Sequence, residues 1–339
     1  MPAFTHVVLV VFENHEATSI AGNPAAPTFN ALARRYATMT DYDAVAHPSL
    51  PNYLALVSGS THGISSDCTD CVVRARSLAD TLAAAGKTWK TYAEDLPYPG
   101  FIGGSAGRYA KKHDPFLYFR DVVDSRARRD RVVPFTRLAR DLAGHRLPDF
   151  SLVIPNLCDD MHDCSVATGD AWLEAQVVPL LHSRQLRGGV IFVVFDEGTS
   201  DAGGGGRVEA LALGPTVRRG SRFAKATNHY GLLRTIEDAW ALPRLGLSRT
   251  ATPLDVFGGG RTPSLSTESS RACSSPSHAR SSSATRPSAT AHASPRLPSL
   301  SHWRWDGIAS GSAPFGSPRL STTWARSRCG RSCSASPAR

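Results

Sequence analysis

Two apolar stretches of the chain end in oxygen-bearing side chains. The run HVVLVVF is followed by Glu13 and Asn14, and the run VIFVVF by Asp196 and Glu197. Carboxylate and amide oxygens are the ligands that hard divalent cations prefer. If both runs are strands of one parallel sheet, their ends lie close together, and the sequence predicts a cation site there. The alternative is that these side chains cap helices or lie in solvated loops.

A serine stands at the start of a third apolar stretch, HPSLPNYLALVSGS. Pro51 follows Ser49 closely and NYLALVSG has helical apolar spacing, which predicts Ser49 at a helix N-terminus. Free N–H groups and the helix dipole favour an oxyanion or a phosphate at such a place. Ser49 is therefore a candidate nucleophile, although capping the helix is the commoner role of such a serine. His47, which precedes a proline, is expected to orient this turn.

Histidines supply the candidates for proton transfer. His113 lies in KKHDPF and His162 in CDDMHDC, both in predicted loops rich in polar residues. A histidine in an ordinary loop is solvated, but the acids and cysteines around His162 favour a positioned side chain. His229, in NHYGLL, fits a helix start and a site member equally well.

Strands and helices alternate along the chain and determine where these residues meet. Apolar strand-like runs occur at 6–12, at 150–154, before Asp196 and in RVEALALGP, and segments with helical spacing separate them. Alternation without hairpin signals predicts an α/β fold with a mostly parallel sheet, sandwiched by helices on both faces. Ligands of such sheets bind at the carboxyl ends of the strands, where Asn156 also falls.

Seven blocks of the sequence, in order within residues 5–257, carry a resemblance to a known family. They are FENHE, HPSLPNYLALVSGSTHG, TYAEDLP, KHDPFLYF, PDFSLVIPNLCDDMHDCSVATGDAWL, FDEG and NHYGLLRTIEDAWALP. Together they resemble the phosphoesterase family, which contains bacterial acid phosphatases and non-specific phospholipases C and is related to the alkaline phosphatase superfamily. The resemblance implies a doubly wound, alkaline phosphatase-like α/β sheet and metal-assisted phosphoryl transfer to a hydroxyl.

The resemblance also implies a role for each candidate residue. These roles are metal ligation by Glu13, Asn14, Ser49, Asp196 and Glu197, attack on phosphorus by Ser49, and phosphate contact or leaving-group assistance by His113 and His162. A serine hydroxyl is a poor nucleophile at neutral pH until coordination to a cation lowers its pKa. The expected cofactor is thus one divalent cation of unknown identity, and the expected intermediate is a phosphoserine.

The expected activity is hydrolysis of a phosphomonoester in the manner of an acid phosphatase. A phospholipase C-type phosphodiesterase is the alternative, although the body lacks the large insertions or extra β domain that lipid-acting relatives tend to carry. A sulfatase is disfavoured because the segment SLPNY lacks the arginine of a C/S-x-P-x-R frame. The expected partner is a small-molecule or lipid phosphate ester, and no specific nucleic acid is expected.

The end of the chain differs in composition from the rest. Residues 261–339 hold 22 Ser, 8 Pro, 11 Arg, no Lys and two acids, which accounts for the whole formal net charge of +9. Without a periodic apolar face such a segment cannot offset its ordering entropy. We expect a catalytic domain at 1–258 and a disordered tail at 259–339. A shifted reading frame is an alternative origin of the tail, and electrostatic binding of nucleic acid or anionic surfaces is a distant alternative function.

Four cysteines form two close pairs, Cys68 with Cys71 and Cys158 with Cys164. Such pairs suit loop disulfides in an oxidising compartment, with a zinc CxxC site as the rival interpretation. The longest apolar runs fall short of the ~18 residues of a transmembrane helix, and the start MPAFTHVVLVVFENHE lacks the features of a signal peptide. The cysteine pairs and the resemblance together predict an extracellular or cell-envelope protein.

Overall fold

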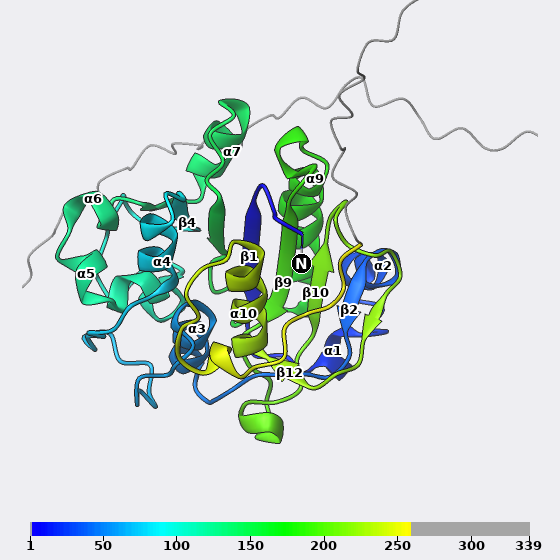
Figure 1. Ribbon diagram of the computed structural model, residues 1–339. Coiled ribbons are helices and arrows are strands. Elements are labelled where there is room, and N and C mark those ends of the chain that lie inside the picture. Colours follow the sequence, from blue (N-terminus) through cyan, green and yellow to red (C-terminus); the bar gives the residue numbers. More distant parts are fainter. Residues whose placement is uncertain (1, 259–339) are drawn as a thin grey trace, which may run out of the picture. The chain divides into compact units, whose positions relative to one another are not determined.

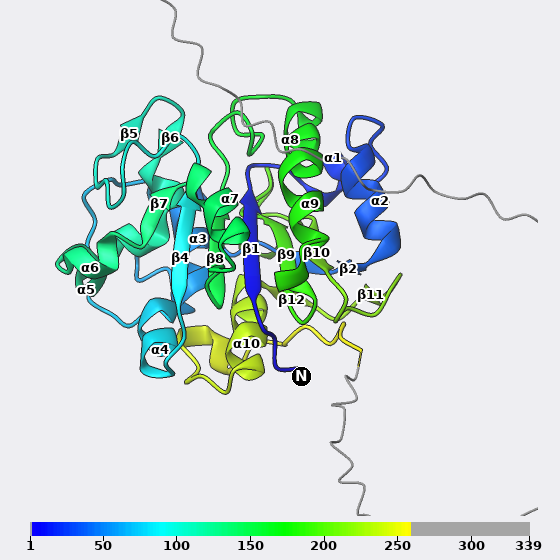
Figure 2. The same ribbon diagram turned by 90° about the horizontal axis from the view of Figure 1, so that it is seen from above.

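A computed structural model describes residues 2–258; the predicted tail, 259–339, lies outside the described residues. Figures 1 and 2 show a central sheet with helices on both faces. Its strands run in the order β11 (Arg222–Phe223), β2 (Ala37–Met39), β10 (Ala210–Leu213), β9 (Val190–Phe195), β1 (Val7–Phe12), β8 (Phe150–Ile154), β4 (Trp89–Ala93) and β7 (Val132–Pro134). From β9 through β1, β8 and β4 to β7, each strand is parallel to the next, which confirms the mostly parallel sheet.

The central strands form the core of the molecule. Every residue of β1, β8 and β9 is buried. Because helices cover both faces of a parallel sheet, its strands have no solvated side, and a continuous apolar run replaces the alternating pattern of a half-exposed strand. The apolar runs VVLVVF, FSLVI and VIFVVF therefore determine both where the strands lie and how deeply they are buried.

The helices divide between the two faces of the sheet (Figures 1 and 2). One face carries α3 (Ser49–Ser58), α4 (Leu78–Ala84) and α10 (His229–Ala239), and the other carries α2 (Pro27–Arg35), α7 (Thr136–Ala143), α8 (Val166–Trp172) and α9 (Val178–Leu181). At the end of β1, Phe12 packs against Phe29 of α2 and Trp172 of α8. The next residue, Glu13, faces Tyr53 of α3. Successive side chains of a strand point to opposite faces, so the acid is delivered to the face that carries α3.

Short elements complete the described chain. They are α1 (Ala17–Ile20), α5 (Arg120–Val123), α6 (Arg126–Arg129), the strand pair β3 (Tyr42–Asp43) and β12 (Thr227–Asn228), and the pair β5 (Ser105–Ala106) and β6 (Tyr109–Ala110). The pair β5 and β6 is an antiparallel hairpin, which the sequence did not signal. Gly107, with φ +57°, makes its turn possible.

Strand β10 runs antiparallel to β9 and β2, against the direction of the central strands. The segment 196–209, which joins β9 to β10, contains only the 3₁₀ helix Ala202–Gly204. A parallel neighbour needs a crossover connection, usually through an α-helix, whereas a short loop returns the chain antiparallel. Residues 196–209 contain no crossover α-helix, as expected for antiparallel neighbours.

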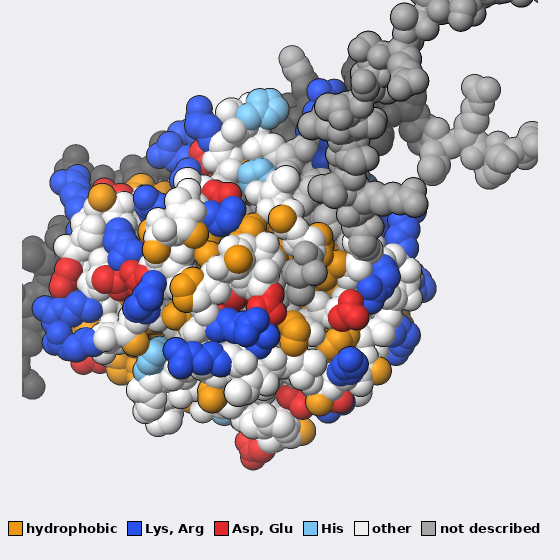
Figure 3. All heavy atoms as spheres, in the orientation of Figure 1, with side chains coloured by type: hydrophobic (Ala, Val, Ile, Leu, Met, Phe, Trp, Pro, Cys, Tyr) orange, Lys and Arg blue, Asp and Glu red, His pale blue; other side chains and the backbone are white. Residues whose placement is uncertain are grey.

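Both predicted cysteine pairs are disulfides, Cys68–Cys71 and Cys158–Cys164. Throughout residues 2–258, every helix is too short or too polar to cross a bilayer. Basic and acidic side chains are interspersed on the face shown in Figure 3, which α10 covers. This mixture agrees with the equal numbers of acidic and basic residues, 27 each, in residues 1–260.

Candidate active site

The register of the sheet brings the two acidic strand ends together. Phe12 of β1 pairs with Phe195 of β9, so that Glu13 and Asp196 leave the sheet at the same level. The backbone N–H of Asn14 donates to Asp196 Oδ1 over 3.2 Å. The oxygen-bearing side chains that the sequence sets after two separate strands therefore lie at one edge.

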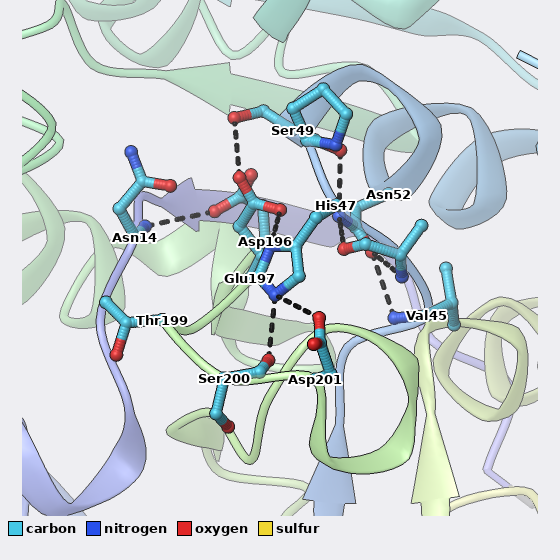
Figure 4. A network of polar contacts seen from close by, with 12 residues as sticks. Asn14, Val45, His47, Ser49, Asn52, Asp196, Glu197, Thr199, Ser200 and Asp201 are labelled. Carbon is cyan, nitrogen blue, oxygen red and sulfur yellow. Dashed lines mark hydrogen bonds and ion pairs between the residues drawn. The ribbon is translucent and has the colours of Figure 1, made fainter. Parts of the chain in front are cut away.

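Ser49 lies between these two strand ends. It is the first residue of α3 and is 1% exposed. Its Oγ lies 3.1 Å from Glu13 Oε2 and 3.2 Å from Glu197 Oε1, and Figure 4 shows Asn14, Ser49, Asp196 and Glu197 converging. The hydroxyl has one proton, so it donates to one carboxylate at a time. The Ser49 side chain thus contacts carboxylates, and the N-cap position of α3 belongs to Pro48.

His113 connects Glu13 to a further acid, Asp160. Tyr53 donates its hydroxyl to Glu13 Oε1 over 2.6 Å, and His113 Nε2 lies 3.1 Å from the same oxygen. The other ring nitrogen, Nδ1, lies 3.3 Å from Asp160 Oδ2, and the ring stacks on Tyr53. His113, expected in a polar loop, is 1% exposed in the 3₁₀ helix Lys111–His113. Ligand atoms of Glu13, His113 and Asp160 lie within 4.8 Å of one another, a spacing suited to a shared metal ion.

Four carboxyl groups of the site form what we call the acidic cluster: Glu13, Asp160, Asp196 and Glu197. Glu13 and Glu197 contact Ser49, and Asp160 contacts His113. Burial, and then the charges of Asp196 and Asp160, raise the pKa of Glu13. Burial and the charge of Glu197 raise the pKa of Asp196, and burial raises that of Asp160 to about 7. Asp196 Oδ2 is buried and has no hydrogen-bond partner among residues 2–258. The positive charge of Lys112 offsets only part of the effect on Glu13 and Asp160, and a divalent cation fits this cluster.

His162 lies at the rim of the site. Its Nδ1 is 2.7 Å from Asp163 Oδ1, and its Nε2 is 3.1 Å from Lys112 Nζ. An ammonium group only donates, so Nε2 accepts in this arrangement and the ring proton lies on Nδ1. The backbone N–H of His162 donates to Asp160 Oδ1, and the Cys158–Cys164 disulfide closes the loop that holds both residues.

Two more histidines support the acidic pair after β9. His47 Nδ1 lies 2.6 Å from Glu197 Oε2, and His47 Nε2 lies 2.7 Å from the Ser200 carbonyl (Figure 4). His229 Nε2 lies 2.5 Å from the Asp196 carbonyl, and burial lowers the pKa of His229 to about 4. A neutral ring must donate from this nitrogen to the carbonyl. His229 is thus both the first residue of α10 and a support of the site.

Asn156 follows β8 at the same edge but turns to another acid. Its backbone N–H donates to Glu94 Oε2 over 3.1 Å, and its side chain donates to Asp159. The Asn156 carbonyl accepts the backbone N–H of Asp160 over 2.9 Å, but within residues 2–258 no hydrogen bond joins the Asn156 side chain to Ser49 or to the carboxyl groups of the acidic cluster. The structure therefore brings together Glu13, Asn14, Ser49, Asp196 and Glu197, places His113 and His162 beside them, and leaves Asn156 outside.

Sequence reasoning missed four residues of this site: Tyr53, Asp67, Lys112 and Asp160. Asp67 Oδ2 lies 3.0 Å from Lys112 Nζ, and its Oδ1 accepts the N–H of Leu50, next to Ser49. Lys112 is adjacent to His113 in KKHDPF, and Asp160 lies two residues before His162 in CDDMHDC. Lys112 and Asp160 could have been found in the sequence as charged residues close to a candidate histidine.

Comparison with known proteins identifies the family. Residues 23–243 match the model of the Phosphoesterase family. The chain belongs to this family. The match includes Ser49, His113, His162 and the acids after β9, and it begins after Glu13 and Asn14, which the pairing of β1 with β9 brings to the same edge.

Similar proteins carry phosphatase names. The chain is 37% identical over 262 residues to a phosphatidylinositol-3-phosphatase of Mycobacterium tuberculosis, a match that covers 76% of this chain and 84% of that protein. It is 31% identical over 228 residues to an acid phosphatase of Aspergillus fumigatus, covering 63% of this chain and 51% of that protein. The chain thus spans about half the length of this fungal relative. Family and relatives together identify a phosphoric ester hydrolase.

The fold agrees with this membership. A solved structure of a protein in the alkaline phosphatase superfamily from Vibrio parahaemolyticus has a TM-score of 0.50 and 13% sequence identity, over 72% of this chain and 68% of that one. At this identity the similarity concerns the fold, and it confirms the alkaline phosphatase-like sheet.

Proposed function

We propose that the protein is a metal-dependent phosphomonoesterase that works through a phosphoserine at Ser49. The observation that carries this proposal is the position of the Ser49 hydroxyl, buried between Glu13 and Glu197 at the carboxyl edge of the sheet. A hydroxyl held only as a helix cap would contact backbone N–H groups instead. Proximity to carboxylates that also suit a cation is what a serine nucleophile needs.

One divalent cation fits the oxygens of this site. The proposed ligands are Glu13, Asn14, Ser49, Asp196 and Glu197. The free oxygen of Asp196 and the raised pKa values of the buried acids support a cation here. When bound, such a cation lowers the pKa of the serine hydroxyl and neutralises charge on the phosphoryl oxygens. His113 lies against Glu13 Oε1, and in this proposal it orients that carboxylate.

The chain's own groups carry the rest of the reaction. Ser49 gives its hydroxyl proton to Glu13 or Glu197, its Oγ attacks phosphorus, and the ester oxygen leaves, so one P–O bond forms as another breaks. His162, at the rim, is the proposed proton donor to the leaving oxygen, a role typically worth about 10²–10⁴ in rate. Its Nε2 faces Lys112, so it donates from this nitrogen only when the ring is doubly protonated. Water then hydrolyses the phosphoserine and regenerates the serine.

The proposed substrate is a phosphate monoester, either soluble or on a lipid headgroup. The names of the mycobacterial and fungal relatives, a phosphatidylinositol-3-phosphatase and an acid phosphatase, support monoester cleavage. The two disulfides support an oxidising compartment outside the cytoplasm.

Purified full-length protein tests this proposal. We expect hydrolysis of p-nitrophenyl phosphate that is lost with a chelator and restored by a divalent cation. Ser49→Ala should abolish turnover and bind the cation more weakly, while its melting temperature stays within a few degrees of wild type. Turnover by Ser49→Ala above a small fraction of wild type would refute the nucleophile assignment. Faster cleavage of phosphatidylcholine than of monoesters would favour the phospholipase C alternative.

A further inference from the structure

Lys112 lies at the rim of the site and is tied to the residue that follows the nucleophile. Its Nζ is 3.0 Å from Asp67 Oδ2 and 3.1 Å from His162 Nε2. The other oxygen of Asp67 accepts the backbone N–H of Leu50 over 3.0 Å. One carboxylate therefore fixes the ammonium relative to the first turn of α3.

Two hydrogen bonds leave part of this ammonium free. The group carries three N–H donors, and Asp67 and His162 take two of them. The third has no acceptor within residues 2–258. The side chain of Lys112 is 19% exposed, so it is not sealed in the interior. The preceding Lys111 differs, because its Nζ donates to the Thr69 carbonyl and lies over the ring of Tyr118.

The negative charge of the site indicates what the free N–H donor of Lys112 can do. The acidic cluster places four carboxyl groups in the site, and one divalent cation offsets at most two charges. Within residues 2–258, the basic side chain that hydrogen-bonds to an acid at this rim is that of Lys112. A lysine ammonium is charged at neutral pH, and it can offset the repulsion that a phosphate dianion meets here.

We propose that Lys112 binds a terminal phosphoryl oxygen of the substrate through its free N–H and so favours monoester dianions over diesters. This inference rests on the proposed phosphatase function. A monoester presents three terminal oxygens and two negative charges, whereas a diester has two such oxygens and one charge. A charged donor at the third oxygen therefore stabilises the monoester more.

The test measures phosphate affinity as well as activity, on the full chain with its activating cation. Inorganic phosphate should inhibit Lys112→Met about 10- to 100-fold more weakly than it inhibits the wild type. Calorimetry should show the same loss of phosphate affinity, as expected for a lost charged hydrogen bond. The kcat/KM for p-nitrophenyl phosphate should fall at least as much, and that for bis(p-nitrophenyl) phosphate should fall less. Lys112→Arg should restore phosphate affinity to within about ten-fold of wild type.

Two variants separate this role from a structural one. Lys87 forms a matched ion pair with Asp149 over 3.1 Å, with side chains 24% and 30% exposed, before the opposite ends of β4 and β8. Lys87→Met should leave phosphate affinity unchanged. Asp67→Asn releases the ammonium from its anchor but keeps its charge, so it should weaken phosphate binding less than Lys112→Met does. Should Lys112→Met fail to fold, Lys112→Gln gives the same comparison.

The outcomes distinguish this inference from the function on which it rests. Equal phosphate affinity in wild type and Lys112→Met would overturn the inference, as would an equal loss in Asp67→Asn. A wild-type protein that binds phosphate through Lys112 but hydrolyses no phosphate ester would refute the proposed function and leave the binding role of Lys112 standing.

Discussion

Asp196 is the residue whose replacement best separates the proposed metal site from the rest of the fold. It is fully buried, burial and the charge of Glu197 raise its pKa, and its Oδ2 has no partner within residues 2–258. In the absence of metal, this carboxyl group destabilises the folded protein because its charge is neither solvated nor paired. Asp196→Asn, which removes the charge and keeps the shape, should therefore raise the melting temperature of the metal-free protein.

The same substitution should remove the stabilisation that a metal provides. A cation at about 100 times its Kd stabilises the folded state by about 2.7 kcal/mol. For a domain of this size, that is a rise of roughly 5–10 °C in melting temperature. If the lost carboxylate costs about 100-fold in affinity, the same concentration gives Asp196→Asn only about 0.4 kcal/mol. The variant should thus melt above wild type with chelator and below it with metal.

Thermal melts with EDTA and then with an excess of each divalent cation measure both effects. Asp149→Asn is the matched control, because Asp149 lies before the opposite end of the sheet and holds Lys87 and Thr88. These contacts lower its pKa despite burial, so losing the charge should destabilise the protein and leave the metal response intact. A full metal-dependent rise in Asp196→Asn would refute its role as a ligand.

Two further outcomes are expected. Burial raises the pKa of Glu209 from 4.5 to about 7, so the wild type loses stability as the pH rises through this window. Glu209→Gln should therefore unfold with a free energy about 3 kcal/mol higher than wild type at pH 8, and with no gain below pH 4.5. Urea unfolding at the two pH values measures this gain, and an equal gain at both would contradict it. Replacing Cys158 and Cys164 by serine should lower the free energy of unfolding by about 2 kcal/mol. Because His162 is then held less firmly, kcat/KM should fall by up to about 100-fold. Unchanged kinetics would show that the loop is positioned without the disulfide.

The sequence predicts the centre of this fold well. Continuous apolar runs identify β1, β8 and β9 because these strands are buried on both faces. Parallel strands end at a common edge, so Glu13 and Asp196 could be expected to approach each other without knowledge of the strand order. That the two acids leave the sheet at the same level, however, follows from the pairing of Phe12 with Phe195, which is a property of the assembled sheet.

The rest of the site depends on loops whose paths no local sequence pattern predicts. Asp67 reaches Leu50 and Lys112 from the segment between α3 and α4, and no periodic pattern fixes that path. His113 occurs in a polar block, but stacking on Tyr53 and contact with two acids bury it. Tertiary contacts of this kind override local polarity, so these neighbours could be found only in the assembled structure.

The contacts of Ser49 connect nucleophile activation with metal binding. In the structure its hydroxyl is oriented by Glu13 and Glu197, both proposed as ligands of the cation. While these carboxylates accept its proton, the hydroxyl is positioned but stays protonated, because a neighbouring negative charge disfavours an alkoxide. A bound cation would offset part of this negative charge and, with Ser49 among its proposed ligands, would favour loss of the hydroxyl proton. The metal-free enzyme should therefore be folded, with its nucleophile in place, and chemically inert.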